Sequence, residues 1–316
     1  MATAFVFPGQ GSQVVGMGKA LAGAFSAARA VFDEVDASHG QHLTKIMWDG
    51  PEAELTLTEN AQPALMAVSV AVMRVLEAEH GVSLSKVAKF VAGHSLGEYS
   101  ALAAAGTFAL GDAARLLKIR GKAMQAAVPV GQGAMAALLG LNFATAAAVA
   151  AEAAQGEVCQ VANDNSDGQV VVSGSKAAVD RACEIAKAKG AKRAILLAVS
   201  APFHCALMQP AADAMADALS KVQMHAPVVP VIANVLAGPL TDPTAIKDAL
   251  VRQVTGTVRW RECVGFMVAN GVNRFVEVGA GKVLTGLAKK NAPEALAVNV
   301  GTPDEIAALQ LSVILA

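Results

Sequence analysis

The 316-residue chain contains little charge and few cysteines. Charged residues make up 16% of the sequence and hydrophobic residues 54%, and the formal net charge is −1. This balance argues against a disordered chain and gives no sign of nucleic-acid binding. Four cysteines lie far apart, without the spacing of a metal site or a disulfide framework, so we expect buried, reduced thiols and no metal. They are Cys159, Cys183, Cys205 and Cys263.

Long uncharged apolar runs and a basic N-terminal segment are also missing. No stretch of about 18 apolar residues is free of charges and chain breakers, so the sequence predicts no membrane span. The first residues, Met1 to Pro8, have no basic region of the kind that begins a signal peptide. We therefore expect a cytoplasmic protein that binds neither nucleic acid nor a membrane.

Apolar strands alternate with helix-like segments over most of the chain. The predicted strands of a main sheet are Ala4–Phe7, Val87–Ala92, Pro227–Ala233 and Arg274–Gly279. Helices are predicted over Ala64–Glu79, after a break at Asn60–Pro63, over Leu207–Val222, and last over Gly281–Lys290. This alternation predicts an α/β fold with a mainly parallel, doubly wound sheet, like that of the α/β-hydrolases.

The pattern changes between residues 128 and 198. Strands are predicted over Met135–Leu141, Val158–Ala162, Gln169–Ser173 and Ala194–Ala198, helices over Ala144–Ala154 and Ala177–Lys189, and a turn over Asn163–Gly168. The order βαββαβ is typical of a ferredoxin-like unit, whose two ends lie close enough for insertion into another domain. We expect residues 1–127 and 199–316 to form a large α/β domain, and 128–198 a small subdomain.

Gly93-His94-Ser95-Leu96-Gly97 lies between a predicted strand and a helix-like run that begins at Glu98. Strand, tight turn and helix is the context in which Gly-x-Ser-x-Gly forms a nucleophile elbow. The turn strains the serine backbone and places it at a helix N-terminus, where N–H groups point at a developing negative charge. The pattern alone is weak, and a glycine-flanked turn with an idle serine is the alternative.

A serine nucleophile needs a base within hydrogen-bond reach. Of the six histidines, His94 should point away from Ser95 if the elbow forms, and four others lie in polar or loop-like contexts. His204 follows Pro202-Phe203 at the start of a predicted helix, which suits a base at the carboxyl edge of the sheet. No acidic residue between Ser95 and His204 is an obvious third member of a triad. The sequence therefore favours a Ser–His dyad in which a backbone carbonyl orients the imidazole.

Four dispersed motifs occur in the order and spacing of malonyl-CoA:acyl carrier protein transacylases. They are Phe7-Pro8-Gly9-Gln10-Gly11-Ser12-Gln13, Gly93-His94-Ser95-Leu96-Gly97-Glu98-Tyr99, Arg120-Gly121 and Pro202-Phe203-His204. The chain resembles this bacterial family over essentially its whole length. It is also similar to the acyltransferase domains of polyketide and animal fatty-acid synthases.

The resemblance implies a role for each matching position. Ser95 would carry the acyl group, and His204 would be its base and acid. Gln10 and Leu96 would supply the N–H groups of an oxyanion hole. Arg120 would hold the malonyl carboxylate in a bidentate pair, and an acyl group without that carboxylate would leave the arginine unpaired.

Three further positions match less directly. The backbone carbonyl of Gln253 would orient the histidine, and Asn163 would line the cleft from the small subdomain. Phe203 would disfavour a 2-methyl branch through its bulk. Spacing alone gives no reason to single out Arg120 among the basic residues of its predicted helix.

The implied reaction is transfer of malonyl from malonyl-CoA to the phosphopantetheine thiol of holo-acyl carrier protein. It would follow a ping-pong course through malonyl-Ser95 and serve fatty acid biosynthesis. The protein would be a monomer without a cofactor of its own. Two basic runs are candidate docking sites for the acidic carrier, although each is equally well explained as a solvated face. The runs are Lys187, Lys189, Lys192 and Arg193, and Lys282, Lys289 and Lys290.

Three other functions compete with this interpretation. A trans-acting acyltransferase of a polyketide pathway would use the same chemistry. A serine hydrolase or thioesterase would share the elbow but would transfer the acyl group to water. A non-catalytic module that binds acyl-CoA or a carrier protein would not need both Ser95 and His204.

Overall fold

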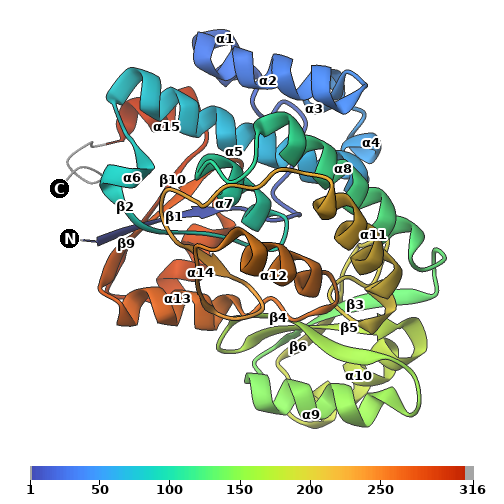
Figure 1. Cartoon of the computed structure of the whole chain (residues 1–316). Helices are drawn as coiled ribbons and strands as arrows, with labels where there is room; N and C mark the ends of the chain where they lie inside the picture. Colours follow the sequence, from blue (N-terminus) through green and yellow to red (C-terminus); the bar gives the residue numbers. More distant parts are fainter. Residues whose placement is uncertain (1, 310–316) are drawn as a thin grey trace.

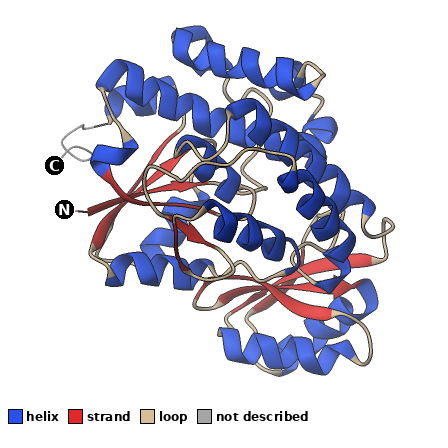
Figure 2. Ribbon diagram, in the orientation of Figure 1, coloured by secondary structure: helices blue, strands red, loops and turns tan. Residues whose placement is uncertain are grey.

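Two β-sheets organise the chain (Figure 2). The computed structural model describes residues 2–309, apart from the side chain of His39. Sheet A has six strands in the order β10-β9-β1-β2-β7-β8. These are β1 (Ala2–Phe7), β2 (Ala88–Gly93), β7 (Val231–Ala233), β8 (Gly238–Leu240), β9 (Val272–Val278) and β10 (Leu296–Val300).

Neighbouring strands of sheet A run parallel, except that β8 is antiparallel to β7. The mainly parallel sheet predicted from the sequence is therefore confirmed. Parallel strands share one carboxyl edge, and ligands of open α/β sheets bind there. The segments that follow β1, β2 and β7 leave three adjacent strands at this edge.

Helices flank both faces of sheet A (Figure 1). Before the second sheet these are α1 (Lys19–Ala24), α2 (Ser26–His39), α3 (Leu43–Asp49), α4 (Glu52–Thr56), α5 (Thr58–His80), α6 (Leu84–Val87), α7 (Gly97–Ala104) and α8 (Leu110–Ala126). After it come a 3-10 turn (Ala206–Met208), α11 (Gln209–Ser220), α12 (Pro243–Thr255), α13 (Trp260–Ala269), α14 (Val283–Asn291) and α15 (Pro303–Ala308).

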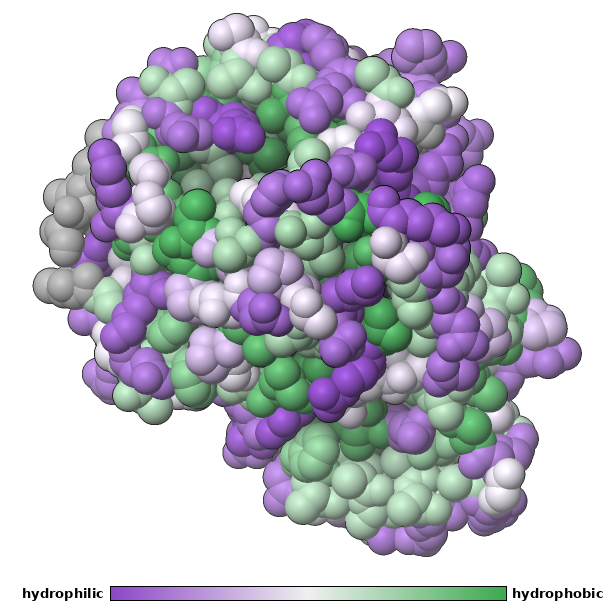
Figure 3. Space-filling model, viewed as in Figure 1, coloured by the Kyte–Doolittle hydropathy of each residue, from purple (hydrophilic) through white to green (hydrophobic). Residues whose placement is uncertain are grey.

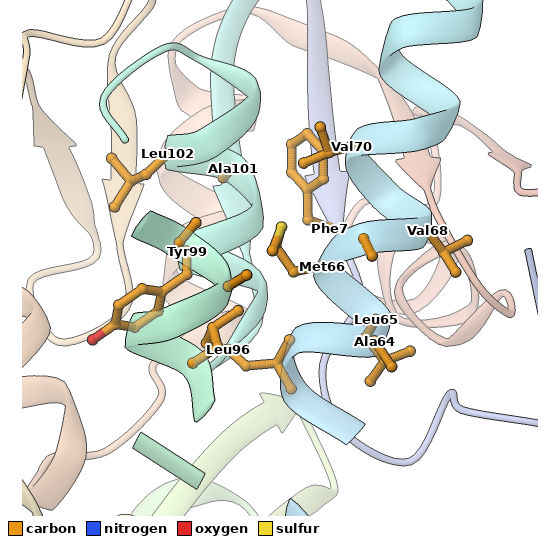
Figure 4. Close-up of a cluster of buried hydrophobic side chains, with 14 of the residues drawn as sticks. Phe7, Ala64, Leu65, Met66, Val68, Val70, Leu96, Tyr99, Ala101 and Leu102 are labelled. Atoms are coloured by element: carbon orange, nitrogen blue, oxygen red, sulfur yellow. The ribbon is translucent and has the colours of Figure 1, made fainter. Parts of the chain in front are cut away.

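Side chains of β1 alternate between two cores, as the twofold repeat of a strand requires. Phe5 and Phe7 belong to a core that includes residues of α2, α5, α7 and α8. Ala4 and Val6 belong to a second core with residues of α13 and α14. Figure 4 shows Phe7 between side chains of α5 and of the α7 segment that follows the predicted elbow. Packing on both faces thus fixes the strand that precedes the Pro8–Gln13 loop.

Sheet B is antiparallel and has the order β4-β5-β3-β6. Its elements are β3 (Gly133–Leu139), α9 (Phe143–Ala154), β4 (Cys159–Ser166), β5 (Gln169–Ser175), α10 (Lys176–Ala188) and β6 (Arg193–Leu196). This βαββαβ order, with both helices packed on one face, is the predicted ferredoxin-like arrangement. The domain boundaries at 127/128 and 198/199 stay a prediction.

The predicted turn over Asn163–Gly168 is wrong over its first four residues, because β4 continues to Ser166. The backbone N–H of Asp164 donates to the carbonyl of Val258 (2.9 Å), and the N–H of Val258 donates to the carbonyl of Ala162 (2.8 Å). A segment far away in the sequence therefore extends the strand. Asp164 also pairs with Arg261 (2.8 Å), so that β4 joins sheet B to the larger part of the chain.

The predicted break at Asn60–Pro63 is also wrong, because α5 begins at Thr58 and continues through Pro63. Proline removes one helical hydrogen bond near the helix start, and tertiary packing outweighs that loss. The residues from Asn60 to Met73 are buried. At the other end of the chain, Gly281–Lys290 is confirmed as α14, but the sequence analysis missed β10 and α15 beyond it.

In the described part of the chain, α5 alone has the length and mean hydropathy that a membrane span requires. Of its most apolar window, 83% is buried within the protein, which is the pattern of a core helix. Figure 3 shows hydrophilic residues over much of one face of the molecule, with a pale green area at the bottom, where the alanine-rich α9 lies.

Candidate active site

A cavity of about 370 Å³ lies between the carboxyl edge of sheet A and sheet B. Residues of sheet B, of the loops that follow β1, β2 and β6, and of α4, α5 and α8 line it. All of the sequence-predicted site residues except Gln253 are among them: Gln10, Ser95, Leu96, Arg120, Asn163, Phe203 and His204. Met135 of β3 and Asn163 of β4 supply the side that belongs to sheet B.

Ser95 lies two residues after the end of β2 and has a φ of 54°, a left-handed conformation that is costly for a residue with a side chain. The flanking glycines allow this turn. A Cβ atom at Gly97 would lie 2.2 Å from the carbonyl oxygen of Phe7, and one at Gly93 would lie 1.8 Å from the carbonyl carbon of Gly97. Backbone thus packs against backbone, and Ser95 is placed one residue before the cap of α7.

His204 is within hydrogen-bond reach of Ser95. Its Nε2 lies 2.8 Å from Ser95 Oγ, and its Nδ1 lies 2.9 Å from the backbone carbonyl oxygen of Gln253. A carbonyl can only accept, so Nδ1 carries the hydrogen and Nε2 accepts from the serine hydroxyl. Burial, together with the charge of Arg120, lowers the pKa of His204 to about 3. The free imidazole is therefore neutral at pH 7 and can take the serine proton.

Arg120 of α8 is 1% exposed, and its guanidinium points at the serine. Its Nη2 donates to Ser95 Oγ (3.1 Å) and to Gln253 Oε1 (2.9 Å), and Nη1 donates to Gln62 Oε1 (2.8 Å). The ring of Tyr99 lies 5.7 Å from the guanidinium carbon.

Among the described residues, the charge of Arg120 has no anionic partner of its own. Within residues 2–309 no acidic side chain forms an ion pair with it, and its Nε–H makes no hydrogen bond. Burial lowers its pKa, but an arginine keeps its proton at physiological pH. A buried cation of this kind favours a ligand that brings a carboxylate.

Gln10 and Leu96 offer two backbone donors to the cavity. Neither N–H forms a hydrogen bond within the described chain. Leu96 caps the N-terminus of α7, where the helix dipole adds a partial positive charge. The Gln10 side chain is held by Thr58 Oγ1 (3.4 Å). Free N–H groups beside a serine suit an oxyanion hole.

Of the remaining predicted residues, two lie in the wall of the cavity and one lies behind it. Asn163 and Phe203 line the cavity and are 7% and 8% exposed. Gln253 lies behind it, where its carbonyl meets His204 and its side chain meets Arg120. His94 points toward β4, with Nε2 2.8 Å from Asn165 Oδ1 and its ring 5.6 Å from that of Trp260.

The sequence analysis missed three polar side chains that support the site: Gln62, Glu98 and Asn234. Asn234 Oδ1 accepts the N–H of Ser95 (2.8 Å), and its Nδ2 donates to the carbonyl of Gly93 (2.7 Å). Asn234 follows β7, next to β2 in the sheet, so its place after a predicted strand was a usable signal. For Glu98 the sequence contained no signal other than its position three residues after Ser95.

Comparisons with known proteins decide the family. The acyl transferase domain family matches residues 4–302. The malonyl CoA-acyl carrier protein transacylase of Escherichia coli (strain K12) is 49% identical over 305 residues, which cover 96% of this chain and 97% of the relative. The same enzyme of Bacillus subtilis (strain 168) is 44% identical and is covered to 94%. The chain belongs to the malonyl CoA-acyl carrier protein transacylase family.

Solved structures of transacylases have the same fold. The acyl-carrier-protein-S-malonyltransferase of Bartonella henselae matches with a TM-score of 0.96 and 57% identity over 99% of each chain. A malonyl-transacylase in complex with a type II PKS acyl-carrier protein matches with a TM-score of 0.94 and 44% identity, again over 99% of each chain. The family, the fold and the acyltransferase class predicted from the sequence are confirmed.

Proposed function

We propose that this protein transfers the malonyl group of malonyl-CoA to the phosphopantetheine thiol of an acyl carrier protein. The observation that carries the proposal is the position of Arg120. This buried cation has no acidic partner among residues 2–309, and its Nη2 lies 3.1 Å from Ser95 Oγ, the atom that would carry the acyl group. A malonyl ester on Ser95 carries its free carboxylate two carbon atoms from the ester carbonyl, within reach of this guanidinium.

The first half-reaction loads the serine. Ser95 Oγ attacks the thioester carbonyl while His204 Nε2 takes the hydroxyl proton, which their 2.8 Å contact allows. The negative charge that develops on the carbonyl oxygen is stabilised by the free N–H groups of Gln10 and Leu96. The C–S bond then breaks, and the CoA thiolate takes the proton from His204. Malonyl-Ser95 and free CoA result.

The second half-reaction runs the same steps with another thiol. The pantetheine thiol of the carrier gives its proton to His204 and attacks the malonyl ester. Ser95 Oγ leaves and regains the proton from the imidazolium. The pantetheine belongs to the carrier, so this chemistry requires no cofactor of the transacylase. The carbonyl of Gln253 keeps the imidazole aligned in both halves.

Specificity follows from what surrounds the acyl group. The malonyl carboxylate replaces the contact of Arg120 with the free serine hydroxyl, and an acetyl group offers no such partner. Phe203 occupies space beside the base, which disfavours a methyl branch at C2, and Asn163 adds a polar group from β4. The site therefore selects an unbranched acyl group that ends in a carboxylate.

Fatty acid synthesis is the pathway that we propose, in a monomeric, cytoplasmic protein whose small subdomain comprises residues 128–198. A role in a polyketide pathway is the second candidate, because one of the similar transacylases was solved with a type II PKS carrier. A hydrolase or thioesterase is less well supported, since a backbone carbonyl rather than an acidic side chain orients His204.

Intact-mass analysis tests the proposal. After mixing with malonyl-CoA, the protein should gain the mass of one malonyl group, and holo-carrier protein should remove it. Ser95→Ala should abolish the adduct. An adduct that survives this substitution, or loss of the adduct to water as fast as to the carrier, would contradict the proposed function. Carriers of fatty acid and polyketide systems, compared by kcat/KM, separate the two pathways.

A further inference from the structure

A buried carboxyl group lies behind the cavity and outside its lining. Glu98 is in the first turn of α7, three residues after Ser95, and is 1% exposed. Burying a carboxyl group costs free energy unless hydrogen-bond donors satisfy it. On the basis of the proposed function, we propose that Glu98 is a positioning residue that holds the nucleophile and the carboxylate-binding arginine in one arrangement.

Two donors meet at one oxygen of this carboxyl group. Oε2 of Glu98 accepts the backbone N–H of Asn234 (2.9 Å) and the Nε2 amide of Gln253 (2.9 Å). Neither donor residue lines the cavity, but each contacts residues that do. The carboxyl group of Glu98 therefore acts on the reacting groups only through other residues.

The first route passes through the amide of Gln253. A carboxylate only accepts hydrogen bonds and a guanidinium only donates them. The amide nitrogen must therefore face Glu98 and the carbonyl of Ser95 (3.0 Å), and the amide oxygen must face Nη2 of Arg120 (2.9 Å). If the amide were flipped, its N–H groups would face the N–H groups of Arg120, and the hydrogen bond between the two side chains would be lost. Glu98 and the carbonyl of Ser95 together thus fix the acceptor that orients the guanidinium.

The second route passes through Asn234. Its backbone N–H bonds to Glu98, while its side chain clamps the elbow on both sides of His94, at the carbonyl of Gly93 and the N–H of Ser95. The two routes are joined by a contact between Gln253 Nε2 and Asn234 Oδ1 (3.3 Å). Elbow and arginine are thereby connected through a single carboxyl group.

The indirect connection has a consequence for substrate binding. Glu98 and Arg120 attract each other electrostatically without forming an ion pair, because the Gln253 amide lies between them. A carboxylate bonded directly to Arg120 would occupy the position that the malonyl group needs. Relayed through an amide, the attraction between Arg120 and the ionised form of Glu98 offsets part of the cost of burying the arginine and leaves its ligand-binding face free.

Two substitutions in the full chain test this role, with the initial rate of acyl-Ser95 formation from malonyl-CoA and from acetyl-CoA as the readout. Glu98→Ala should raise KM for malonyl-CoA and lower the malonyl/acetyl ratio of kcat/KM by about tenfold or more, the value of a hydrogen bond to a charged group. Glu98→Gln keeps an acceptor oxygen for both donors and should restore the ratio to within about threefold of wild type.

The proposal is overturned if Glu98→Ala leaves the ratio unchanged, or if Glu98→Gln lowers it as far as Glu98→Ala does. Should Glu98→Ala fail to fold, Glu98→Asp supplies the test, because its shorter side chain withdraws the carboxyl group from the amide of Gln253. The malonyl/acetyl ratio of kcat/KM should then fall below that of Glu98→Gln. An unchanged ratio in this variant also overturns the proposal.

Glu277 provides a matched control. It is a fully buried carboxyl group on β9 that accepts the backbone N–H groups of Leu284 (3.0 Å) and Thr285 (2.6 Å), away from the cavity. Glu277→Gln should lower stability without changing the malonyl/acetyl ratio. If the wild-type protein forms no malonyl-Ser95, the proposed function itself fails. If it does and the Glu98 variants keep the ratio, only the positioning role fails.

Discussion

The elbow that carries Ser95 and the segment that carries His204 are held in different ways. Both residues have a positive φ, 54° and 60°. The elbow is fixed locally, by two glycines that bring backbone against backbone. His204 lies in a segment without glycine or regular structure, and its ring is held from 49 residues away by the carbonyl of Gln253. The nucleophile thus depends on its own turn, whereas the base depends on the assembled fold.

Removing the base should have the largest effect. His204→Ala leaves the elbow intact and removes general base catalysis, so malonyl-Ser95 formation should slow by about 10³-fold. Rapid-quench measurement of the loading rate checks this value. The near-UV circular dichroism spectrum should not change, because the segment is also held by a bond from the N–H of Ala206 to Gln160 Oε1 (2.7 Å). A variant that loads at more than a tenth of the wild-type rate would remove His204 as the base.

Disturbing the elbow should cost stability as well as activity. Gly97→Ala places a Cβ atom 2.2 Å from the carbonyl of Phe7, so β1 or α7 must shift, at a cost of about 3 kcal/mol in the free energy of unfolding. Gly286→Ala is the matched control, since this exposed position in α14 has no neighbour within 4 Å of the added Cβ. It should be neutral or stabilising by up to about 1 kcal/mol. Equal stabilities of the two variants would contradict the local account of the elbow.

The contributions of Glu98 and His204 to stability should change with pH in opposite directions. Burial raises the pKa of Glu98, beside the elbow, from 4.5 to about 7, so the folded protein holds this proton more tightly than the unfolded chain. Its contribution to stability therefore falls as the pH rises from 4.5 to 7. Burial lowers the pKa of His204 from 6.5 to about 3, and its contribution rises with pH between those values.

Glu98→Gln removes only the first of these slopes. Relative to wild type, the variant should gain up to about 3 kcal/mol of unfolding free energy between pH 4.5 and pH 7. Urea unfolding of both proteins at pH 5 and pH 7.5 measures this difference. A difference that is the same at both pH values would mean that Glu98 does not titrate in this range.

Carrier docking should give the smallest effect. The basic run around α14 adjoins the Pro8–Gln13 loop and sheet B, since Gly281 approaches Ser12 and Lys290 bonds to Gln169 (3.1 Å). In the run at the end of α10, Lys187 and Lys189 are paired with Glu184 and Glu152. We expect the less neutralised α14 run to steer the acidic carrier.

Charge reversal compares the two runs. Lys289→Glu with Lys290→Glu should raise KM for the carrier several-fold at low salt, and the effect should shrink as salt is added. Lys189→Glu with Lys192→Glu should change KM less. Loading from malonyl-CoA should be unaffected in both, which separates docking from chemistry. The opposite order of effects would assign docking to the run at the end of α10.

Local patterns were sufficient to predict the elbow, four of the six strands of sheet A (β1, β2, β7 and β9) and the βαββαβ insert. Contacts between distant segments were not visible. The strand continues past Asn163 because it pairs with Val258, and the helix continues through Pro63 because that segment is buried. No local pattern in the sequence indicates either the pairing or the burial. Glu98 and Asn234 were missed for the same reason, because their importance lies in which groups they join. The family resemblance supplied the residues Arg120 and Gln253, for which spacing gave no signal.

Arg120 is where the two regions meet, since its Nη2 contacts both Ser95 Oγ and the residue that holds His204. The most direct test of the account is the rate of acyl-Ser95 formation by Arg120→Ala, measured with malonyl-CoA and acetyl-CoA in parallel. Malonyl loading should fall by about 10²-fold or more, the value of a buried ion pair, while acetyl loading falls far less. Equal losses with the two substrates would show that Arg120 supports the structure and does not select the acyl group.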